Sequence, residues 1–528
     1  MFSWLKWGKP PHPMADLEKV REWVAALPGH DPARALDKVA GWLASIGQIP
    51  KISLRQRLEL IDLLDKAANA HWRKLVQQYI SAPHLQEAEE NRLWNASFGF
   101  WKTLGAAYLR CIENFEMGAS GAKAVREDLA LIAGRALRAS SLQLKWTFLR
   151  YGQVEKRIWH ELGSAYLFAE SQGFAALRAE LYPAPRGQSS AQEELLRALM
   201  LVMVSPNNLT PMKQHIAERV IGYFGSRFVL QKEPVPGCGF FFDLAMAAPP
   251  ARLQKERAAG SMVRFFGAGE AGRGLTDLMR EIRAKDGIPR DVNLGGEFDR
   301  ETVLSVLAHL ERYWNGTPPA RRAERGEFVT RITVVPGLPN ILRCLELVAN
   351  GAPLDPRNFP EQESWLTANR SDDGLGVLVP AEKESFDYDP LTGDRIGAGN
   401  WLRVGRLVAL TEENARTWKL GIVRRITHEG SGQRYAGIEL LEGMAIVITL
   451  SSASGPRSGQ PERRRSAVLL ANAIDKNDEA LVLMRAGHFA ETQALSMHRE
   501  GKRYLLMPTA LVEGGEDFDC ARFKMRPA

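Results

Sequence analysis

The sequence predicts an α+β protein of several domains, with an all-α N-terminal half, a β-barrel-like domain and a small β-rich C-terminal domain. Apolar residues recur at three- and four-residue steps through about the first 230 positions, which is the spacing of one face of a helix. From Phe328 onward they alternate, which is the spacing of a strand. A chain of 528 residues is also too long to fold around a single hydrophobic core.

Composition narrows the class of protein. With 45% hydrophobic and 25% charged residues, the chain has the composition of a globular protein. The net charge of +7 suits an anionic partner but is small for this length, so neither DNA nor RNA binding is expected. No apolar run reaches the roughly 18 residues that a membrane-spanning helix needs, so we expect no transmembrane segment.

The cysteines and the N-terminus predict a cytoplasmic protein. Four cysteines lie far apart and form no CxxC pair: Cys111, Cys238, Cys344 and Cys520. We therefore expect neither a zinc site nor a disulfide framework. The opening stretch, "MFSWLKWGKPPHP", has no apolar core of signal-peptide length. A reducing cytoplasm fits both observations, and we expect no metal and no cofactor.

Residues 1–230 read as an array or bundle of helices. The clearest helix follows Ser53, a residue type that caps helix N-termini. Its apolar face consists of Leu54, Leu58, Ile61, Leu64, Ala68, Trp72 and Leu75. Turn residues separate the helical stretches at 183–185 and 205–208. We find no strict period, so no named repeat is predicted.

Three further regions follow the helical half. Residues 231–317 mix Pro, Gly and short apolar runs with two helical patterns, "GLTDLMREIRAK" and "RETVLSVLAHLERYW". Residues 318–450 contain β-patterned segments, and the loop "EGSG" predicts a hairpin between two of them. One stretch there, "GLPNILRCLELVANGAPLDPRNFP", reads partly as an inserted helix. Residues 465–528 give short strands again, after a linker rich in Ser, Gly, Pro and Arg.

A glycine motif raises the possibility of an enzyme. Gly267, Gly269 and Gly272 match GxGxxG, whose glycines let a backbone approach a pyrophosphate. That motif needs a parallel βαβ unit, and the flanking sequence here reads as helical, so a flexible joint is the preferred interpretation. An enzyme with its site in residues 232–275 is the least supported hypothesis, because we find no HExxH, GxSxG or P-loop motif. No catalytic residue is predicted.

The stretch "NRSDDGLG" lies between two apolar runs, "SWLTA" and "VLVP". Side chains such as Asn369 and Ser371 can bond the backbone two residues on, and Gly374 tolerates a tight turn. The resulting turn presents small polar groups and backbone N–H groups, which suits an anion. The same residue types also make an ordinary hairpin turn.

An arginine cluster lies in an expected loop just before the first strand of the same β-domain. It contains Arg321, Arg322 and Arg325. A guanidinium can donate two bonds to guanine O6 and N7, pair bidentately with phosphate oxygens and stack on a purine. Two arginines four residues apart on a loop can clamp a nucleotide against a strand turn. The alternative is a solvated linker, which is the commoner case for charge runs.

The two motifs together resemble those of a known family. Arg321-x-x-x-Arg325 followed by Asn369-x-Ser371-x-x-Gly374 is similar to the paired RxxxR and (D/N)xSxxG motifs of the PilZ domain. The segments "RVGRLVAL", "LGIVRRI" and "YAGIELL" follow in the order and style of later PilZ strands. The resemblance covers about residues 318–450. It implies a six-stranded antiparallel β-barrel that binds the bacterial second messenger cyclic di-GMP.

The resemblance also implies a role for each matching residue. The ligand would be held by Arg321, Arg322, Arg325, Asn369, Ser371 and Gly374. The arginines would grip guanine and phosphate from their loop, and the other three residues would form the turn that receives the other side of the ligand. Binding would then order the loop and reorient the helical region for contact with an unknown protein partner.

The alternative hypothesis is a helical scaffold or interaction protein whose PilZ-like barrel no longer binds nucleotide. More residues separate the two motifs than we expect for the family, because of the inserted helix. An insert that covers the barrel mouth would alter or abolish binding. The helical array would then be the working surface of the protein.

Overall fold

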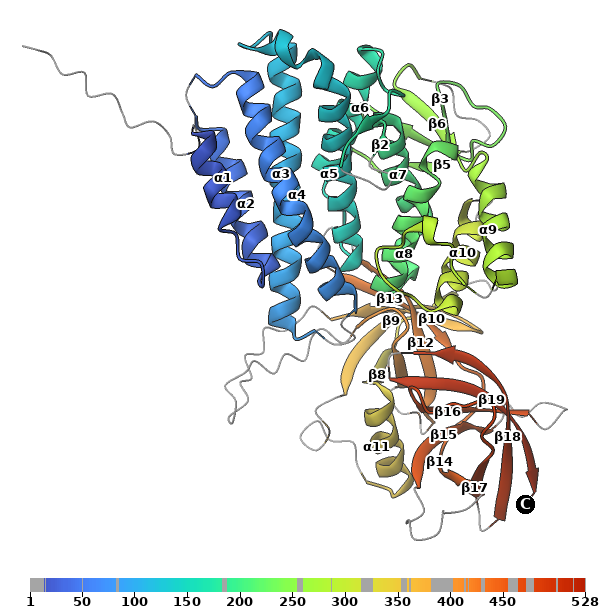
Figure 1. Cartoon of the computed structure of the whole chain (residues 1–528). Coiled ribbons are helices and arrows are strands. Elements are labelled where there is room, and N and C mark those ends of the chain that lie inside the picture. The colour runs from blue at the N-terminus through green and yellow to red at the C-terminus, as the bar shows by residue number, and fades with distance from the viewer. Residues whose placement is uncertain are drawn as a thin grey trace, which may run out of the picture. The chain divides into compact units, whose positions relative to one another are not determined.

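The computed structural model confirms the predicted fold class, with helices in the N-terminal half and antiparallel β-barrels in the C-terminal half (Figure 1). It describes residues 14, 16–49, 51–81, 85–182, 188–253, 260–285, 287–314, 326–352, 359, 362–380, 402–412, 415, 417–428, 433–453, 464–471, 479–499, 502–515 and 517–527. The chain divides into two compact units: Met1–Pro206 with Pro211–Pro319, and Asn207–Thr210 with Ala320–Ala528.

The first unit contains most of the helices. They are α1 (Leu17–Ala25), α2 (Pro32–Ile46), α3 (Leu54–Ser81), α4 (Glu87–Glu116), α5 (Leu129–Leu149), α6 (Lys156–Ser171), α7 (Ala191–Met203), α8 (Pro211–Tyr223), α9 (Ala271–Lys285) and α10 (Arg300–Trp314). Helices α2 to α5 pack successively against one another (Figure 1). In the described part of the chain no helix is long and apolar enough to cross a membrane.

Helix α3 begins where the sequence predicts. The Ser53 hydroxyl accepts the Gln56 backbone N–H at 3.3 Å, and the Gln56 side chain accepts the Ser53 backbone N–H at 3.3 Å. This reciprocal pair is a capping box, which satisfies donors that the start of a helix otherwise leaves unpaired. The predicted apolar face is buried at Leu54, Leu58, Ile61, Leu64, Ala68 and Leu75.

Helix α5 lies at the centre of the first unit, because almost every residue along it is buried. Its charged side chains must therefore be paired, since an isolated buried charge is very costly. Lys145 Nζ lies 2.8 Å from Glu218 of α8, and Arg138 forms an ion pair with Glu194 of α7. These pairs fix the positions of α7 and α8 against α5.

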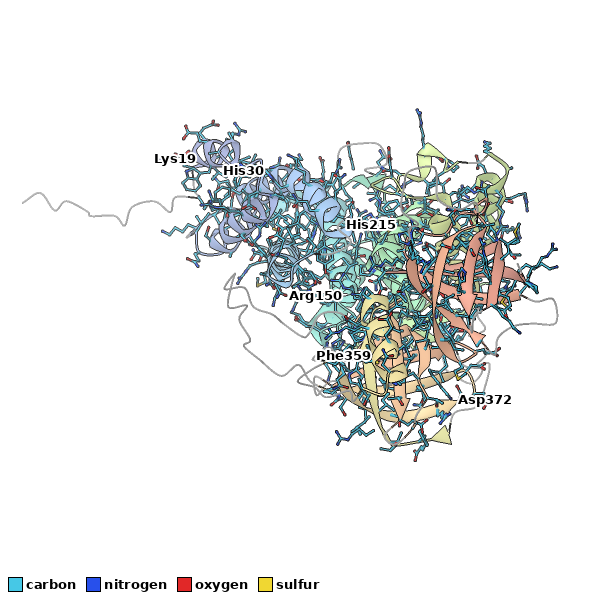
Figure 2. All side chains as sticks on the ribbon, turned by 90° about the horizontal axis from the view of Figure 1, so that it is seen from below. Lys19, His30, Arg150, His215, Phe359 and Asp372 are labelled. Carbon is cyan, nitrogen blue, oxygen red and sulfur yellow. The ribbon has the colours of Figure 1, made fainter. Side chains whose placement is uncertain are left out.

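His215 of α8, which is labelled in Figure 2, extends this buried network. Its Nδ1 lies 2.9 Å from Lys145 Nζ, and its Nε2 lies 3.0 Å from the Leu294 carbonyl oxygen. An ammonium only donates and a carbonyl only accepts, so Nε2 carries the proton and the imidazole is neutral. Burial and the charge on Lys145 lower the pKa of His215 to about 3, which keeps the ring neutral at physiological pH.

The segment before α9 forms regular strands rather than a flexible joint. After the short pair β1 (Ala179–Glu180) and β2 (Gln188–Ser189), a sheet contains β3 (Val229–Gln231), β4 (Phe240–Asp243), β5 (Ala251–Arg252) and β6 (Val263–Gly267). Gly267 ends β6 and α9 follows, so a strand does precede the helix at the GxGxxG motif. Every pairing in this sheet is antiparallel, whereas the dinucleotide motif requires a parallel βαβ unit.

The second unit contains two closed barrels. The first consists of β8 (Arg331–Pro336), β9 (Glu363–Ser371), β10 (Gly374–Val379), β11 (Leu407–Glu412), β12 (Lys419–His428) and β13 (Arg434–Leu440). Its ring order is β8-β9-β10-β13-β12-β11, closed by the pairing of β11 with β8. A short strand, β7 (Gly326–Glu327), adds to β9. The predicted six-stranded antiparallel barrel and the hairpin between β12 and β13 are confirmed.

The C-terminal residues close into a barrel of their own. Its strands are β14 (Ala445–Ser452), β15 (Arg465–Leu470), β16 (Glu479–Arg485), β17 (Leu495–Arg499), β18 (Lys502–Gly514) and β19 (Phe518–Pro527). The ring order is β14-β15-β16-β19-β18-β17. Numbered within each barrel, both rings run 1-2-3-6-5-4. Strand β14 lies within the range predicted for the first barrel, but it pairs with β15 and β17 of the second.

The predicted inserted helix, α11 (Leu338–Ala349), follows β8 in the chain and packs between the two barrels (Figure 1). It packs on β8 and β11 of the first barrel and on β14 and β15 of the second. Its buried face consists of Leu338, Ile341, Leu342, Cys344 and Leu345. The same core contains Trp418 from the first barrel and Val468 and Phe518 from the second. The apolar face of α11 therefore holds the two barrel walls together.

We predict that Ile341→Ala destabilises the second unit. Ile341 is fully buried in the core that both barrels share, and truncation of a buried isoleucine to alanine costs about 2–5 kcal/mol. Calorimetric unfolding of the full chain should show a lower melting temperature for this unit. Glu346→Ala, on the exposed side of α11, is the control and should change stability by at most about 0.5 kcal/mol. Equal effects of the two substitutions would contradict this role of α11.

Candidate functional site

The predicted residues Asn369, Ser371 and Gly374 lie together at the tip of the β9–β10 hairpin. Ser371 pairs with Gly374, so Asp372 and Asp373 form the connection between the strands. The Ser371 hydroxyl donates to the Gly374 carbonyl oxygen at 3.4 Å. Both aspartates are exposed, and Figure 2 shows Asp372 at the edge of the barrel. The second predicted motif is thus a single polar turn at the surface.

Asn369 lies on the outer face of the barrel, over a glycine. Leu375 and Val377 are buried in the barrel interior, at 7% and 0% exposure, so Gly376 between them faces outward. Gly376 is the cross-strand partner of Asn369. A Cβ at position 376 would lie 2.5 Å from Asn369 Oδ1, so the side chain of Asn369 keeps this position only over a glycine. Gly376 was not predicted as a site residue, although a second glycine two positions after Gly374 belongs to the same strand face.

Glycines continue onto the neighbouring strand. Gly376 pairs with Gly437 of β13, and Gly374 pairs with Glu439 of the same strand. Gly437 pairs in turn with Arg425 of β12. We call Gly374, Gly376 and Gly437 the glycine floor, because they lie on the outward face of the barrel wall without side chains. Gly374 and Gly376 are buried and Gly437 is half-buried. Glycines let other groups approach a backbone closely, and here the side chain of Asn369 lies over Gly376.

One unpaired cation lies beside the glycine floor. Arg425 is exposed and forms no ion pair with any residue that the structure describes. Glu439 accepts a hydrogen bond from Arg424 Nε at 2.6 Å, and Arg424 also pairs with Glu513, so these two carboxylates share one cation. Arg425 therefore supplies the unpaired charge at this edge of the floor. Neither Gly437 nor Arg425 was predicted, because cross-strand partners depend on register, which the strand pattern alone does not reveal.

Three predicted residues lie outside the described part of the chain: Arg321, Arg322 and Arg325. The residue that follows them, Gly326, begins β7. Strand β7 pairs with β9, with Gly326 opposite Arg370 and Glu327 opposite Asn369. The first described residue after the RxxxR segment therefore lies beside the strand that carries Asn369 and Ser371.

Arg370, between Asn369 and Ser371, was not predicted as a site residue. Its Nη1 lies 2.9 Å from Glu412 Oε1 of β11, and its guanidinium carbon lies 5.4 Å from the centre of the Phe328 ring. These contacts connect β9 to β11 and to the segment that follows β7. Arg370 therefore helps to fix the point at which the arginine loop reaches the first barrel.

The second barrel repeats the strand order but not the motif. Its corresponding connection, between β15 and β16, has the sequence "ANAIDKND" at 471–478. That sequence contains neither Ser nor Gly and does not match (D/N)xSxxG. The candidate site therefore belongs to the first barrel alone.

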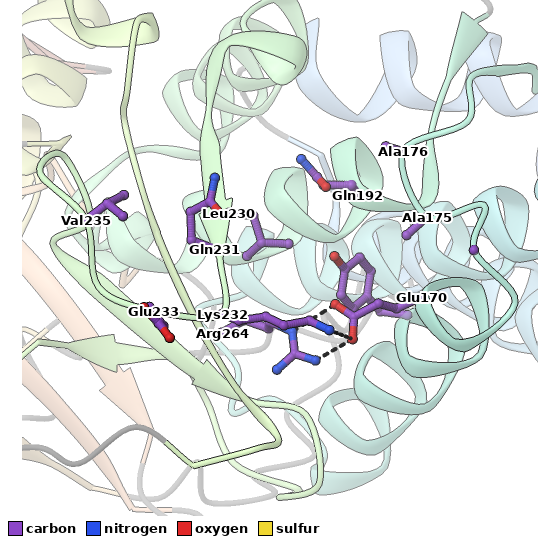
Figure 3. A pocket seen from close by; sticks show the side chains of 12 residues that line it. Glu170, Ala175, Ala176, Gln192, Leu230, Gln231, Lys232, Glu233, Val235 and Arg264 are labelled. Atoms are coloured by element: carbon purple, nitrogen blue, oxygen red, sulfur yellow. Dashed lines mark hydrogen bonds and ion pairs between the residues drawn. The ribbon is translucent and has the colours of Figure 1, made fainter.

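The first unit contains a cavity of about 600 Å³ (Figure 3). Arg264 Nε donates to Glu170 at 2.9 Å, and Lys232 Nζ lies 3.6 Å from the same carboxylate. The hydrogen bonds from Arg264 lower the pKa of Glu170, which stays ionised. With Glu233, two carboxylates and two cations line the cavity. The described residues include no group of His, Cys, Asp and Glu that could hold a metal ion. This cavity therefore shows no clear preference for a charged ligand.

The match to a known protein family lies in a part of the chain that precedes the candidate site. A comparison with curated proteins found no match. Residues 18–235 match the family model described as "Cyclic-di-GMP receptor FimW, N-terminal domain". The match covers less than half of the chain and contains no residue of the candidate site. The largely helical N-terminal part of the chain is therefore similar to the N-terminal domain of a cyclic-di-GMP receptor.

Proposed function

We propose that the chain is a cyclic di-GMP receptor of the PilZ type, with the nucleotide held between the Arg321–Arg325 loop and the glycine floor. The observation that carries this proposal is the pairing of β7 with β9, because it anchors the residue after Arg325 beside Asn369. Two non-overlapping parts of the chain support the same ligand: the family match over residues 18–235 and the two motifs of the first barrel.

In this proposal the ligand is bound by the arginines of the RxxxR motif on one side and by the β9–β10 hairpin on the other. The arginines of the RxxxR motif donate bidentately to guanine and phosphate, as their planar guanidinium groups allow. Asn369 and Ser371 supply polar groups from the hairpin, in which Ser371 pairs with Gly374. Arg425 adds positive charge at the far edge of the floor.

The output of the proposed receptor is a protein–protein contact rather than a reaction. The loop that carries the arginines directly follows α10 in the chain, with residues 315–325 between Trp314 and Gly326. A ligand that binds the ordered loop more tightly than the unordered loop shifts the equilibrium toward the ordered loop. The shift can be no larger than the difference between the two binding free energies. Ordering of this connection would reorient the helical unit toward an unidentified protein partner.

We predict that Arg325→Ala weakens cyclic di-GMP binding by about tenfold to a hundredfold. Loss of one bidentate arginine contact to a base costs about 1–3 kcal/mol. Isothermal titration calorimetry on the full chain should show micromolar or tighter binding for the unchanged protein. Arg280→Ala removes the same charge from an exposed position of α9 and should leave the affinity unchanged.

Two results would contradict the proposal. One is the absence of both heat and a shift in melting temperature when the unchanged protein meets excess cyclic di-GMP; that result favours the scaffold hypothesis. The other is an equal loss of affinity in Arg325→Ala and Arg280→Ala, since it would indicate a general effect of net charge instead of a specific contact.

We also predict that Gly376→Ala weakens binding by about tenfold with little change in stability. The added methyl group displaces the Asn369 carboxamide, and loss of one good hydrogen bond costs about 1–1.5 kcal/mol. The clash involves the end of a side chain that can rotate, so the melting temperature should change only slightly. Gly41→Ala in α2, where a Cβ meets no atom within 4 Å, is the control. Unchanged affinity in Gly376→Ala would argue against a role for Asn369 in binding.

A further inference from the structure

One side chain connects the edge of the glycine floor to the second barrel. The pairing of β12 with β13 skips from Val423 to Arg425, so Arg424 is the extra residue of a β-bulge. The pairing of β18 with β19 shifts between Leu511 and Glu513. A bulge redirects the side chains beside it, and here Arg424 and Glu513 are directed toward each other.

The contacts of Arg424 occupy both edges of its guanidinium. Nε donates to Glu439 at 2.6 Å, while Nη1 and Nη2 donate to the two carboxylate oxygens of Glu513 at 2.5 and 2.7 Å. Bidentate recognition of a phosphate or a carboxylate uses such an edge. An anion can therefore form a bidentate contact with Arg424 only if it displaces one of the two carboxylates.

The two carboxylates belong to different barrels. Glu439 lies on the strand next to Arg424, opposite Gly374, and belongs to the same barrel as Arg424. Glu439 also borders the glycine floor. An anion that binds there repels the Glu439 carboxylate, which makes its pairing with Arg424 more favourable. Glu513 reaches across from β18 of the other barrel. Displacement of Glu513 would therefore leave the pairing of Arg424 with Glu439 inside the first barrel intact.

We propose that Arg424 is a positioning residue shared between the two barrels, and that an anionic nucleotide on the glycine floor competes with Glu513 for it. This inference rests on the proposed function, because it takes cyclic di-GMP as the anion. In the absence of nucleotide, Glu513 holds the guanidinium toward the second barrel. When nucleotide binds, the link between Arg424 and Glu513 is released. The second barrel, which lacks the motif, thereby influences the affinity of the first barrel for cyclic di-GMP.

The test compares cyclic di-GMP affinities of three full-length chains by calorimetry. Glu513→Gln weakens the competitor and should tighten binding by about fivefold or more, the lower end of usual coupling between sites. Glu479→Gln removes the same charge from β16, where the carboxylate lies 3.7 Å from Arg522. Because both variants change the net charge equally, Glu479→Gln should stay within about twofold of the unchanged protein.

A second comparison isolates Arg424. In an Arg424→Gln background the substitution Glu513→Gln should no longer tighten binding, since the shared group is absent. Equal affinities of Glu513→Gln and Glu479→Gln, or weaker binding in Glu513→Gln, would overturn the inference while leaving the receptor proposal intact. Failure of the unchanged protein to bind cyclic di-GMP would instead refute the proposed function itself.

Discussion

The burial of one face of α11 between the two barrels is the interaction on which the second unit depends. A fully buried leucine or isoleucine contributes about 1.5–3 kcal/mol, and α11 buries several such side chains against both walls. This packing holds β12 of the first barrel near β18 of the second, so that Arg424 can reach Glu513. An ion pair at a protein surface contributes little stability by itself. The pair between the barrels is therefore better understood as a consequence of the apolar core than as its cause.

The candidate site depends on absent side chains as much as on those present. The carboxamide of Asn369 occupies space that a side chain at position 376 would fill, and Gly437 continues this surface onto β13. The second barrel has the same strand order but lacks the turn motif. A shared fold thus does not give a shared function, because the chemistry resides in the site.

The predictions that succeeded concern local order. The helix after Ser53, the strands of both barrels and the inserted helix all follow from spacing and turn residues within short segments. The predicted motif residues Asn369, Ser371 and Gly374 also share one short hairpin. The closure of the second barrel and the strand sheet before α9 were missed, since pairing between distant strands depends on partners that no local pattern specifies.

The sequence by itself determined most of the helices, the strands of the two barrels and the residue types of the two motifs, because helix periodicity, strand alternation and turn chemistry act over a few positions. Only the tertiary structure decided which residues meet. It placed Gly326 beside Arg370, Gly437 between Gly376 and Arg425, and Arg424 between two carboxylates. The physical reason is register: a shift of one residue turns every side chain of a strand to the other face, and the packing of the whole barrel selects the register.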